Sequence, residues 1–384
     1  MKDVLIIGGG VIGLSLAYEL ARRGASVRVL DKGRPGREAS WAGAGILPPG
    51  NLETAQNPYE ALTALSHSLH PEWSERLREE TGIDNGFRRT GALHLARTVE
   101  EQTDLAASIN TWRERRIEVE EITASEAAQI EPALCRDASS SSSTNAGHQE
   151  ILAAARVPDE CQLRNPRHLK ALLAACDRRG VVVEAGVAVE DFDLRAGRVT
   201  GVQTSSGVRT AGKFCLCSGA WSASIAAKLG IRLAVKPIRG QMVLLSADRP
   251  LISHIVNEGA RYLVPRTDGR ILVGSTEEDA GFASHPTPEG VRGLLDFALG
   301  LAPGLRVARF EMGWAGLRPG SADGLPYLGT LPGLANVFVA TGHFRSGLQL
   351  STGTAVVTSE VLLDSPLPIN LGPFSPSRKP AGHA

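Results

Sequence analysis

Three glycines and one acid near the N-terminus have the types and the spacing needed to hold a phosphate-rich ligand. Gly8, Gly10 and Gly13 stand close together, and Asp31 follows them at the end of a second apolar run. Gly8 permits a tight turn, Gly10 lets a pyrophosphate approach the backbone, and Gly13 lets a helix pack closely on a strand. Asp31 is suited to accept hydrogen bonds from a ribose diol. These four residues predict a dinucleotide site.

The surrounding segments are those that such a site requires. An apolar strand over Asp3–Ile7 leads into the glycines, and an amphipathic helix is expected over Leu14–Arg23. A second strand over Ser26–Leu30 then ends at Asp31. The N-terminus of the helix would face the phosphates with free N–H groups and the positive end of its dipole. A glycine-rich turn without a ligand is the alternative, and the flanking strands and the acid argue against it.

The composition is that of a balanced globular enzyme. The 384 residues suggest two or three domains, and 41 basic residues balance 41 acidic ones. We therefore expect neither nucleic acid nor an anionic membrane as a partner. No apolar run approaches a membrane span, and the first strand begins at once, so a signal peptide is not expected and the cytoplasm is the expected compartment.

The five cysteines show no metal-ligand spacing, so no metal site is expected. Cys215 and Cys217 lie in a predicted strand, Lys213–Cys217, and point to the same side of it. We interpret them as core residues rather than as a redox pair.

The dinucleotide domain is expected to be discontinuous. Apolar strands at Phe214 and at Asn336–Ala340 each lead into a glycine, and both are expected to rejoin the first βαβ unit. Between them, residues Val235–Leu317 alternate with period two and include a hairpin turn at Thr267–Gly269, which predicts an antiparallel sheet. A nicotinamide enzyme usually keeps its nucleotide domain contiguous, whereas FAD is an extended ligand that needs several segments around it. The small residues of Ala39–Leu47 would let the backbone approach a flat ring, although they could also form a flexible loop.

The chain resembles the amine oxidoreductases of the D-amino-acid oxidase superfamily. The resemblance rests on the segments described above and on four more: Pro237–Gln241, Tyr262–Arg266, Trp314–Gly320 and Gly342–Gly347. Within that superfamily it is most similar to the glycine-oxidase branch associated with thiamine biosynthesis. The resemblance runs from residue 4 to about 360. It implies an α/β fold with a Rossmann-like FAD-binding domain of the glutathione-reductase type, interleaved with an α+β substrate domain built on an antiparallel sheet.

The domain boundaries expected on this basis divide the chain several times. The FAD-binding domain would comprise 1–57, 155–230 and 320–370, and the substrate domain 58–154 and 231–319. A mobile insertion is expected at 137–150, and an irregular tail at 371–384.

The resemblance also implies which residues contact FAD. Besides Gly8, Gly10 and Gly13 they are Val11, Ile12, Asp31, Lys32, Ala39, Ser40, Ala44, Gly45, Ile46, Val187, Gly219, His343, Phe344, Arg345, Ser346, Gly347, Leu348 and Gln349. A helix beginning near Gly347 would place its positive end beside the flavin pyrimidine, where negative charge collects on reduction. FAD is expected to be bound without a covalent link, because no cysteine after Cys217 could reach the ring from the C-terminal loop.

Oxidation of an amino acid requires a group that holds its carboxylate. Arg318 precedes a Pro-Gly pair at a predicted strand end, and a guanidinium binds a carboxylate as a fork. Tyr262 could donate a second hydrogen bond, and Arg345 is a further candidate; the resemblance places all three in the substrate pocket. Arg318 could instead pair with Asp323, Tyr262 could be a core aromatic, and Arg345 could only shape the flavin loop. No catalytic residue is assigned, because hydride transfer from a neutral amine needs no protein base, and His343 is expected to touch FAD through its backbone.

The function expected from this resemblance is FAD-dependent oxidative deamination of glycine, sarcosine or small D-amino acids. A hydride would pass from the substrate α-carbon to flavin N5, giving an oxo acid with ammonia or an amine, and O2 would be reduced to H2O2. One alternative is a D-amino acid dehydrogenase that passes electrons to a quinone or carrier. Another is a non-catalytic FAD-binding scaffold. The oligomeric state is left open between a monomer and a homo-oligomer.

Overall fold

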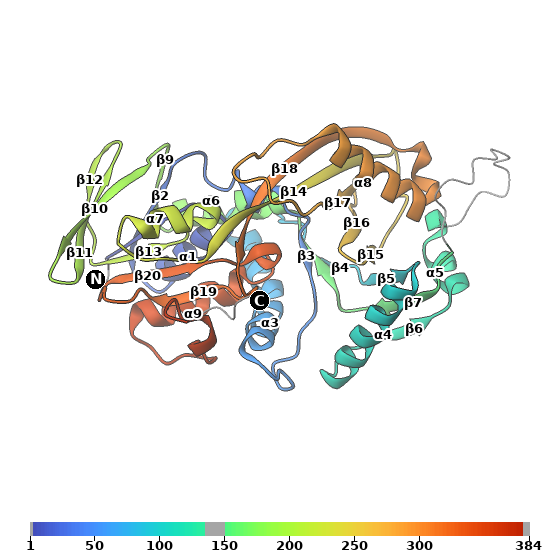
Figure 1. Cartoon of the computed structure of the whole chain (residues 1–384), viewed down its shortest axis with the longest axis horizontal. Coiled ribbons are helices and arrows are strands. Elements are labelled where there is room, and N and C mark those ends of the chain that lie inside the picture. The colour runs from blue at the N-terminus through green and yellow to red at the C-terminus, as the bar shows by residue number, and fades with distance from the viewer. Residues whose placement is uncertain (1–2, 135–149, 379–384) are drawn as a thin grey trace.

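The computed structural model describes residues 3–134 and 150–378, which form two lobes built on two large sheets (Figure 1). A six-stranded sheet lies in one lobe and an eight-stranded sheet in the other. The insertion expected at 137–150 falls, up to residue 149, outside the described residues. Within the described parts of the chain, no helix is both long enough and apolar enough to cross a bilayer.

The six-stranded sheet has the order β19-β20-β13-β1-β2-β9 and is parallel except for β19. Its strands are β1 (Asp3–Ile7), β2 (Ser26–Asp31), β9 (Val182–Ala185), β13 (Lys213–Leu216), β19 (Tyr327–Thr330) and β20 (Val337–Thr341). The strands predicted near Phe214 and Asn336 therefore do rejoin the first βαβ unit, as the sequence indicates. Because both faces of the sheet are covered, its central strands are apolar throughout.

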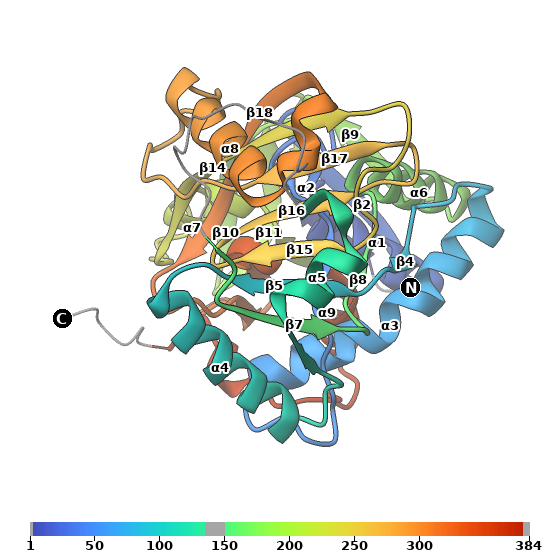
Figure 2. The same ribbon diagram turned by 90° about the vertical axis from the view of Figure 1, so that its right-hand side faces the viewer.

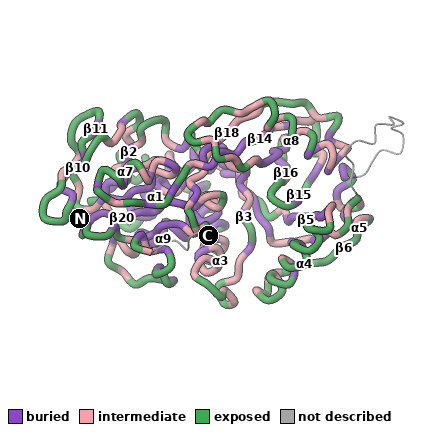
Figure 3. The backbone as a smooth tube through the Cα atoms, in the orientation of Figure 1, coloured by how far each residue is buried: buried purple, intermediate pink, exposed green. Residues whose placement is uncertain are grey.

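Alternate residues of β1 enter two different cores. Val4 and Ile6 pack with the helices α1 (Val11–Arg22), α3 (Pro58–Thr81), α6 (Asn165–Arg178) and α9 (Ser351–Leu363). Leu5 and Ile7 face the opposite side. That side is covered by α7 (Ser222–Ala227) and by a three-stranded sheet of β10 (Val189–Arg195), β11 (Arg198–Thr204) and β12 (Gly207–Arg209). Successive side chains of β1 therefore point to opposite faces of the sheet, and both faces are packed. Figure 3 shows that the strands of this lobe are mostly buried.

The eight-stranded sheet has the order β18-β14-β17-β16-β15-β5-β7-β6. Its strands are β5 (Ala92–Ala96), β6 (Glu120–Ile122), β7 (Ala153–Val157), β14 (Val235–Ser246), β15 (Ile255–Glu258), β16 (Arg261–Pro265), β17 (Arg270–Gly274) and β18 (Arg309–Ser321). The antiparallel sheet expected over Val235–Leu317 is present, with the hairpin β16–β17 at its centre. Three strands from residues 92–157 extend it, and β5 joins it through a parallel pairing with β15.

Helices cover the eight-stranded sheet differently on its two faces. One face packs against α8 (Pro288–Leu301) and α5 (Ala124–Ile130), which lie toward the viewer in Figure 2. The opposite face is turned toward the lobe that contains the six-stranded sheet, where the sequence predicts FAD. At its far end this face meets α4 (Val99–Glu114), which packs through Leu105 and Ile109 on Ala155 of β7.

A small sheet and a short helix connect the two lobes. The sheet consists of β3 (Ile46–Leu47), β8 (Cys161–Gln162) and β4 (Arg88–Arg89), and the helix is α2 (Ala39–Ala42). They bring the small-residue segment predicted to approach a flat ring into the junction between the lobes.

The packing of two segments differs from the expected domain boundaries. Helix α3, expected in the substrate domain, packs through Leu62, Trp73 and Leu77 into the core of the FAD-binding lobe. In the tail, the described residues up to 378 are ordered against the same lobe: Phe374 is fully buried, and Arg378 pairs with Asp323. We propose that α3 and this part of the tail belong to the FAD-binding domain.

Candidate active site

The glycine loop has no room for side chains at two positions. Gly8 adopts a positive φ of 114°, and a Cβ atom there would lie 2.3 Å from the carbonyl oxygen of Cys217 at the end of β13. A Cβ atom on Gly13 would lie 1.9 Å from the carbonyl oxygen of Gly8. Gly8 therefore permits the tight turn, and Gly13 lets α1 pack on it, which are the roles that their spacing predicts.

The carboxylate of Asp31 holds this loop as well as facing the cavity. Its Oδ2 accepts a hydrogen bond from the Gly9 N–H, and its Oδ1 accepts one from the Gly33 N–H, both at 2.8 Å. A carboxylate offers about four lone-pair sites, so two remain for a ribose diol. Asp31 thus has a structural role that the spacing alone did not indicate, and its predicted contact with a ribose stays a prediction.

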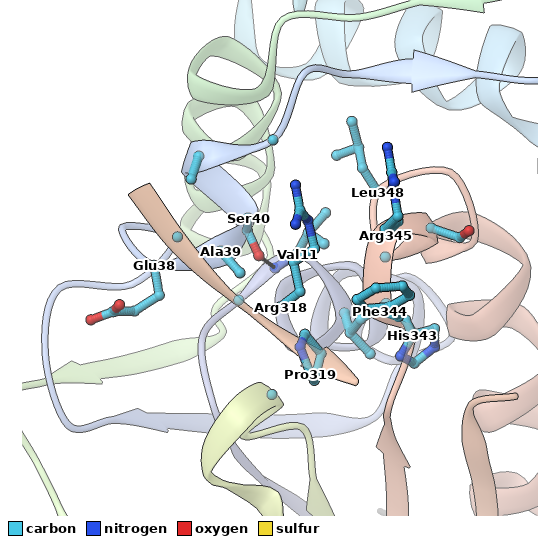
Figure 4. A pocket seen from close by; sticks show the side chains of 18 of the residues that line it. Val11, Glu38, Ala39, Ser40, Arg318, Pro319, His343, Phe344, Arg345 and Leu348 are labelled. Carbon is cyan, nitrogen blue, oxygen red and sulfur yellow. Dashed lines mark hydrogen bonds between the residues drawn. The ribbon is translucent and has the colours of Figure 1, made fainter. Parts of the chain in front are cut away.

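A cavity of about 570 Å³ runs through the junction of the two lobes. Of the residues expected to contact FAD or substrate, all line this cavity except Gly13, which lies behind the loop. Figure 4 shows the part of the wall where Val11, Ala39 and Ser40 approach β18 and the C-terminal loop. The Ser40 Oγ accepts a hydrogen bond from the Val11 N–H at 2.9 Å, which ties α2 to the N-terminus of α1.

The shape and chemistry of this cavity fit an extended dinucleotide. Asp31 lines it beside Lys32, whose ammonium lies 3.5 Å from the ring centre of Trp221. The glycine loop follows, and the segment Ala42–Ile46 lies beyond it. Glycine is required here too, because a Cβ atom on Gly45 would lie 2.0 Å from the Leu163 carbonyl oxygen. The glycine cradle leaves the backbone accessible to a flat, phosphate-bearing ligand such as FAD.

The C-terminal loop is held by two buried histidines. His343 lies 3.1 Å from Thr354 Oγ1 through its Nε2, and His70 Nε2 lies 2.8 Å from the carbonyl oxygen of Gln349. Burial lowers the pKa of His343 to about 3 and that of His70 to about 4, so both rings are neutral near pH 7. His343 is therefore a buried, weakly basic ring and not an exposed general base, and its expected backbone contact with FAD stays a prediction.

The regular helix that follows begins later than predicted. Residues Phe344–Ser346 form a 3₁₀ turn, and α9 starts at Ser351 rather than near Gly347. The intervening Leu350 N–H still donates to the carbonyl of Ser346. Phe344 adopts a positive φ of 48° at the start of this turn, and the loop lines the cavity from Phe344 to Gln349.

Arg318 is a cation in the cavity wall, and no carboxylate of the described residues lies within ion-pair distance of it. Its guanidinium donates to the carbonyl oxygen of Thr276 at 2.9 Å and to Ser275 Oγ at 2.7 Å. None of the ion pairs formed by residues 3–134 and 150–378 includes it. The alternative pairing with Asp323 is wrong, because Asp323 pairs with Arg378 at 2.7 Å. Burial lowers the pKa of Arg318, yet a guanidinium stays protonated, and so its charge is available for an anionic ligand.

Two glycines make room for the predicted substrate-binding side chains. A Cβ atom on Gly240 would lie 2.2 Å from the Arg318 guanidinium, and a Cβ atom on Gly274 would lie 2.5 Å from the Tyr262 ring. The Tyr262 ring lies over Gly274 of β17, where no side chain is in the way. Its hydroxyl donates a hydrogen bond to the sulfur of Met242 at 3.5 Å. Neither glycine was assigned a role from the sequence, although a glycine inside a predicted strand signals close approach of another group.

Arg345 lines the same cavity from the C-terminal loop. Its guanidinium donates to the Ala260 carbonyl oxygen at 2.6 Å and lies 3.6 Å from Glu277. Arg318 and Arg345 extend in the same direction in Figure 4. Arg345 has an acidic neighbour and Arg318 has none within ion-pair distance among the described residues, so Arg318 is the stronger candidate for binding a carboxylate.

Four lining residues outside the predicted set form a polar group at another part of the wall: His94, Trp112, Glu160 and Asn257. They were missed because each lies in a different segment of the chain, and only the pairing of β5 with β15 and the packing of α4 bring them together. The one local signal was a histidine inside the apolar strand Ala92–Ala96.

Comparison with known proteins defines the class of this protein. Residues 3–361 match the sequence family described as FAD dependent oxidoreductase, and the chain belongs to that family. It binds FAD and is an FAD-dependent amine oxidoreductase, with the fold expected from its sequence.

Within this family the chain is similar to glycine oxidases. It is 36% identical over 381 residues to glycine oxidase of Pseudomonas putida, covering 98% of each chain. The crystal structure of glycine oxidase from Geobacillus kaustophilus matches it with a TM-score of 0.90 and 33% identity, covering 99% of this chain and 100% of that one. The bifunctional protein ThiO/ThiG of Trichormus variabilis is 33% identical over 94% of this chain, which spans 53% of that longer protein. The resemblance to the glycine-oxidase branch is confirmed.

Proposed function

We propose that this protein oxidises glycine, sarcosine or small D-amino acids, and that Arg318 binds the substrate carboxylate. The observation that carries the proposal is the position of Arg318, a half-buried guanidinium that lines the cavity and is held by two neutral acceptors rather than by an acid. A carboxylate that forks onto this group would complete its neutralisation in a place from which water is largely excluded. Tyr262 adds a hydroxyl donor from the neighbouring strand β16.

The residues of the chain bind and orient the substrate in this proposal. FAD, when bound, supplies the acceptor for the hydride that leaves the substrate α-carbon. The amine loses two electrons and two protons to become an imine, and water hydrolyses the imine to an oxo acid with ammonia or an amine. O2 takes up the two electrons and two protons to give H2O2. No titratable side chain is assigned as a base, in keeping with the low pKa of the buried His343 ring, which makes it a weak base.

The residues proposed to hold FAD are those of the glycine loop, Asp31, the segment from Ala39 to Ile46 and the loop from His343 to Gln349. We propose that they do so without a covalent link. Cys217, the cysteine that lines the cavity, is buried and lies 3.7 Å from the sulfur of Cys215. Acid precipitation should then release all of the yellow colour into the supernatant, and colour retained in the pellet would refute this point.

A substrate panel tests the proposed function. The holoenzyme would be supplied with glycine, sarcosine, D-alanine and L-alanine in air, with peroxide as the readout and ammonia or methylamine as the second product. We expect peroxide with the first three. Turnover seen only with an artificial quinone would show a dehydrogenase instead, and no turnover with any small amine under either condition would show a scaffold. The similarity to glycine oxidases and to ThiO/ThiG further supports a role in supplying the imine of glycine for thiamine biosynthesis.

A further inference from the structure

The substrate end of the cavity is crossed by a row of side chains that belong to neighbouring strands of the eight-stranded sheet. Tyr262 pairs with Gly274 of β17 on one side and with Asn257 of β15 on the other. Asn257 in turn pairs with His94 of β5. Directly paired residues project from the same face of a sheet, so Tyr262, Asn257 and His94 all face the cavity in one line. The row continues the substrate site away from Arg318.

Beyond Tyr262 this row ends in a polar part of the cavity, which we call the polar end. Glu160 Oε2 lies 3.0 Å from His94 Nε2, and Glu160 Oε1 accepts a hydrogen bond from the Asn257 amide at 3.2 Å. Trp112 of α4 packs edge-on against the His94 ring, with the ring centres 4.8 Å apart, and forms the end wall. The four residues line the same cavity as Arg318, although the carboxylate of Glu160 is only 4% exposed.

The charges along the cavity are arranged with opposite signs at the two ends of this row. Three carboxylates line the described cavity, those of Asp31, Glu38 and Glu160. Asp31 belongs to the dinucleotide loop, and Figure 4 shows Glu38 well away from Arg345. Glu160 is therefore the acidic group of the substrate end, opposite the guanidinium groups of Arg318 and Arg345.

The row leaves an interval beyond Tyr262 that an extension of the substrate can occupy. Adjacent strands are about 4.8 Å apart, so the Tyr262 and His94 backbones are about 10 Å apart across β15. An amino acid with a three-carbon extension that ends in an ammonium group would place that group within this interval. Its carboxylate would meet cations at one end, and its second amine would meet a buried carboxylate and an amide oxygen at the other.

We propose that the polar end of the cavity binds a second amino group of the substrate. Small amino acids that carry a distal ammonium group are then preferred over counterparts of similar length that lack it. The Glu160 carboxylate accepts a hydrogen bond from the ammonium group, and the amide oxygen of Asn257 accepts another. His94 and Trp112 form the end wall of the cavity beside them. This inference rests on the proposed function, because it takes Arg318 as the carboxylate site. The extension can be either the side chain or a substituent on the α-nitrogen, since both begin at the same substrate centre.

Two pairs of compounds that differ in one amino group test the inference on the holoenzyme. D-ornithine is compared with D-norvaline for the side-chain route, and N-(2-aminoethyl)glycine with N-propylglycine for the nitrogen route. Apparent Kd is taken from the concentration dependence of flavin bleaching without oxygen, or from the shift of the flavin band where no bleaching occurs. We expect the compound with the second amine to bind about tenfold to a hundredfold more tightly in at least one pair, as a charge-assisted hydrogen bond would produce.

The variant Glu160→Gln should bring that ratio close to one, and Asn257→Ala should reduce it. Glu190→Gln, which changes an exposed glutamate on β10, is the matched control and should keep the wild-type ratio. If Glu160→Gln fails to fold, as judged by circular dichroism, Asn257→Ala decides the matter.

Equal binding within both pairs by the wild type would overturn the inference, and so would a ratio retained in a folded Glu160→Gln variant. In the latter case a lower Tm would show that the polar group only joins strands. Failure of the proposed function looks different, because glycine and sarcosine would then leave the flavin band of the wild type unchanged.

Discussion

Arg318 concentrates the chemistry of the proposed substrate site in one side chain. It reaches the cavity from β18, crosses the bare backbone of Gly240 and is held by Ser275 and Thr276 on the far side of β14. Two neutral acceptors fix its direction without cancelling its charge. This is the arrangement that a fork-shaped cation needs in order to bind a planar anion.

Replacing Arg318 should impair the use of substrate and leave FAD in place. Leaving the substrate carboxylate unpaired in a desolvated pocket costs on the order of 2–5 kcal/mol. At about 1.4 kcal/mol per decade, Arg318→Ala should lower kcat/KM for glycine by roughly thirty-fold to several thousand-fold. Arg318→Lys should recover only part, because an ammonium cannot fork onto both oxygens. Near wild-type kcat/KM in Arg318→Ala, with a normal flavin spectrum, would refute the assignment.

Asp31 has two sets of hydrogen bonds, and its replacement should affect both. We expect Asp31→Ala to weaken FAD binding and also to lower the Tm of the apoprotein, because the Gly9 and Gly33 N–H groups lose their acceptor. Hydrogen bonds to a charged acceptor are each worth about 1.5–3 kcal/mol. The measurements are FAD Kd by fluorescence quenching and Tm without FAD. An unchanged FAD Kd together with a lowered apoprotein Tm would show that Asp31 only holds the loop.

At the scale of elements, two bare positions in β14 and β17 shape the substrate end. Gly240 makes room for Arg318, and Gly274 makes room for Tyr262, so side chains from adjacent strands can cross them. The strands themselves were predictable from their period of two, as were the glycine loop and the hairpin. The passage of Arg318 over Gly240 and of Tyr262 over Gly274 was not predictable, because it depends on which strands become neighbours in the sheet.

Adding one methyl group at Gly240 should displace Arg318 without touching FAD. The Cβ atom would lie 2.2 Å from the guanidinium, so the side chain of Arg318 must move. We expect Gly240→Ala to lower kcat/KM for glycine by at least about tenfold, a loss of about 1.4 kcal/mol in binding the transition state. Gly293→Ala, at a position in α8 with no atom within 4 Å of the new Cβ, is the control. Equal kinetics for both variants would show that Arg318 tolerates displacement.

The buried histidines that hold the C-terminal loop should make the protein sensitive to mild acid. From the ordinary value of 6.5, burial in the folded state lowers the pKa of His70 to about 4 and that of His343 to about 3, and it also lowers to about 3 the pKa of His168, a buried residue of α6 that lies beside Asn85. Below pH 6.5 the unfolded chain therefore binds more protons, and the free energy of unfolding falls as pH falls toward 5. Each histidine contributes a slope approaching about 1.4 kcal/mol per pH unit.

Substituting one of them should reduce that slope. His70→Gln keeps a donor for the Gln349 carbonyl and removes one of the three titrating groups. Urea unfolding of the apoprotein between pH 6.5 and 5 should show a slope reduced by about a third relative to the wild type, since one of three equal contributions is lost. A slope identical to that of the wild type would mean that His70 is protonated in the folded protein.

At the scale of the whole molecule, the cavity lies where two sheets from interleaved segments meet. The sequence was sufficient for the dinucleotide loop and for the apolar strands that each lead into a glycine, because both are local patterns; most of the other residues expected to contact FAD came from the resemblance to the amine oxidoreductases. It was not sufficient for the extension of the second sheet by β5, β6 and β7, because the parallel pairing of β5 with β15 joins segments that are far apart in sequence. The alternative that Arg318 pairs with Asp323 was wrong because the partner of Asp323 is also distant in sequence. The Asp323 carboxylate forms an ion pair with Arg378 of the tail.

Anaerobic mixing of the holoenzyme with glycine tests the central claim most directly. With oxygen absent, the absorbance of bound FAD reports substrate oxidation alone, and methylamine serves as the matched compound that lacks a carboxylate. We predict that glycine bleaches the flavin band with a rate that saturates with concentration. We predict that methylamine bleaches it far more slowly, and that Arg318→Ala removes the difference between the two. A flavin band unchanged by glycine, or bleached equally by glycine and methylamine in the wild type, would contradict the account.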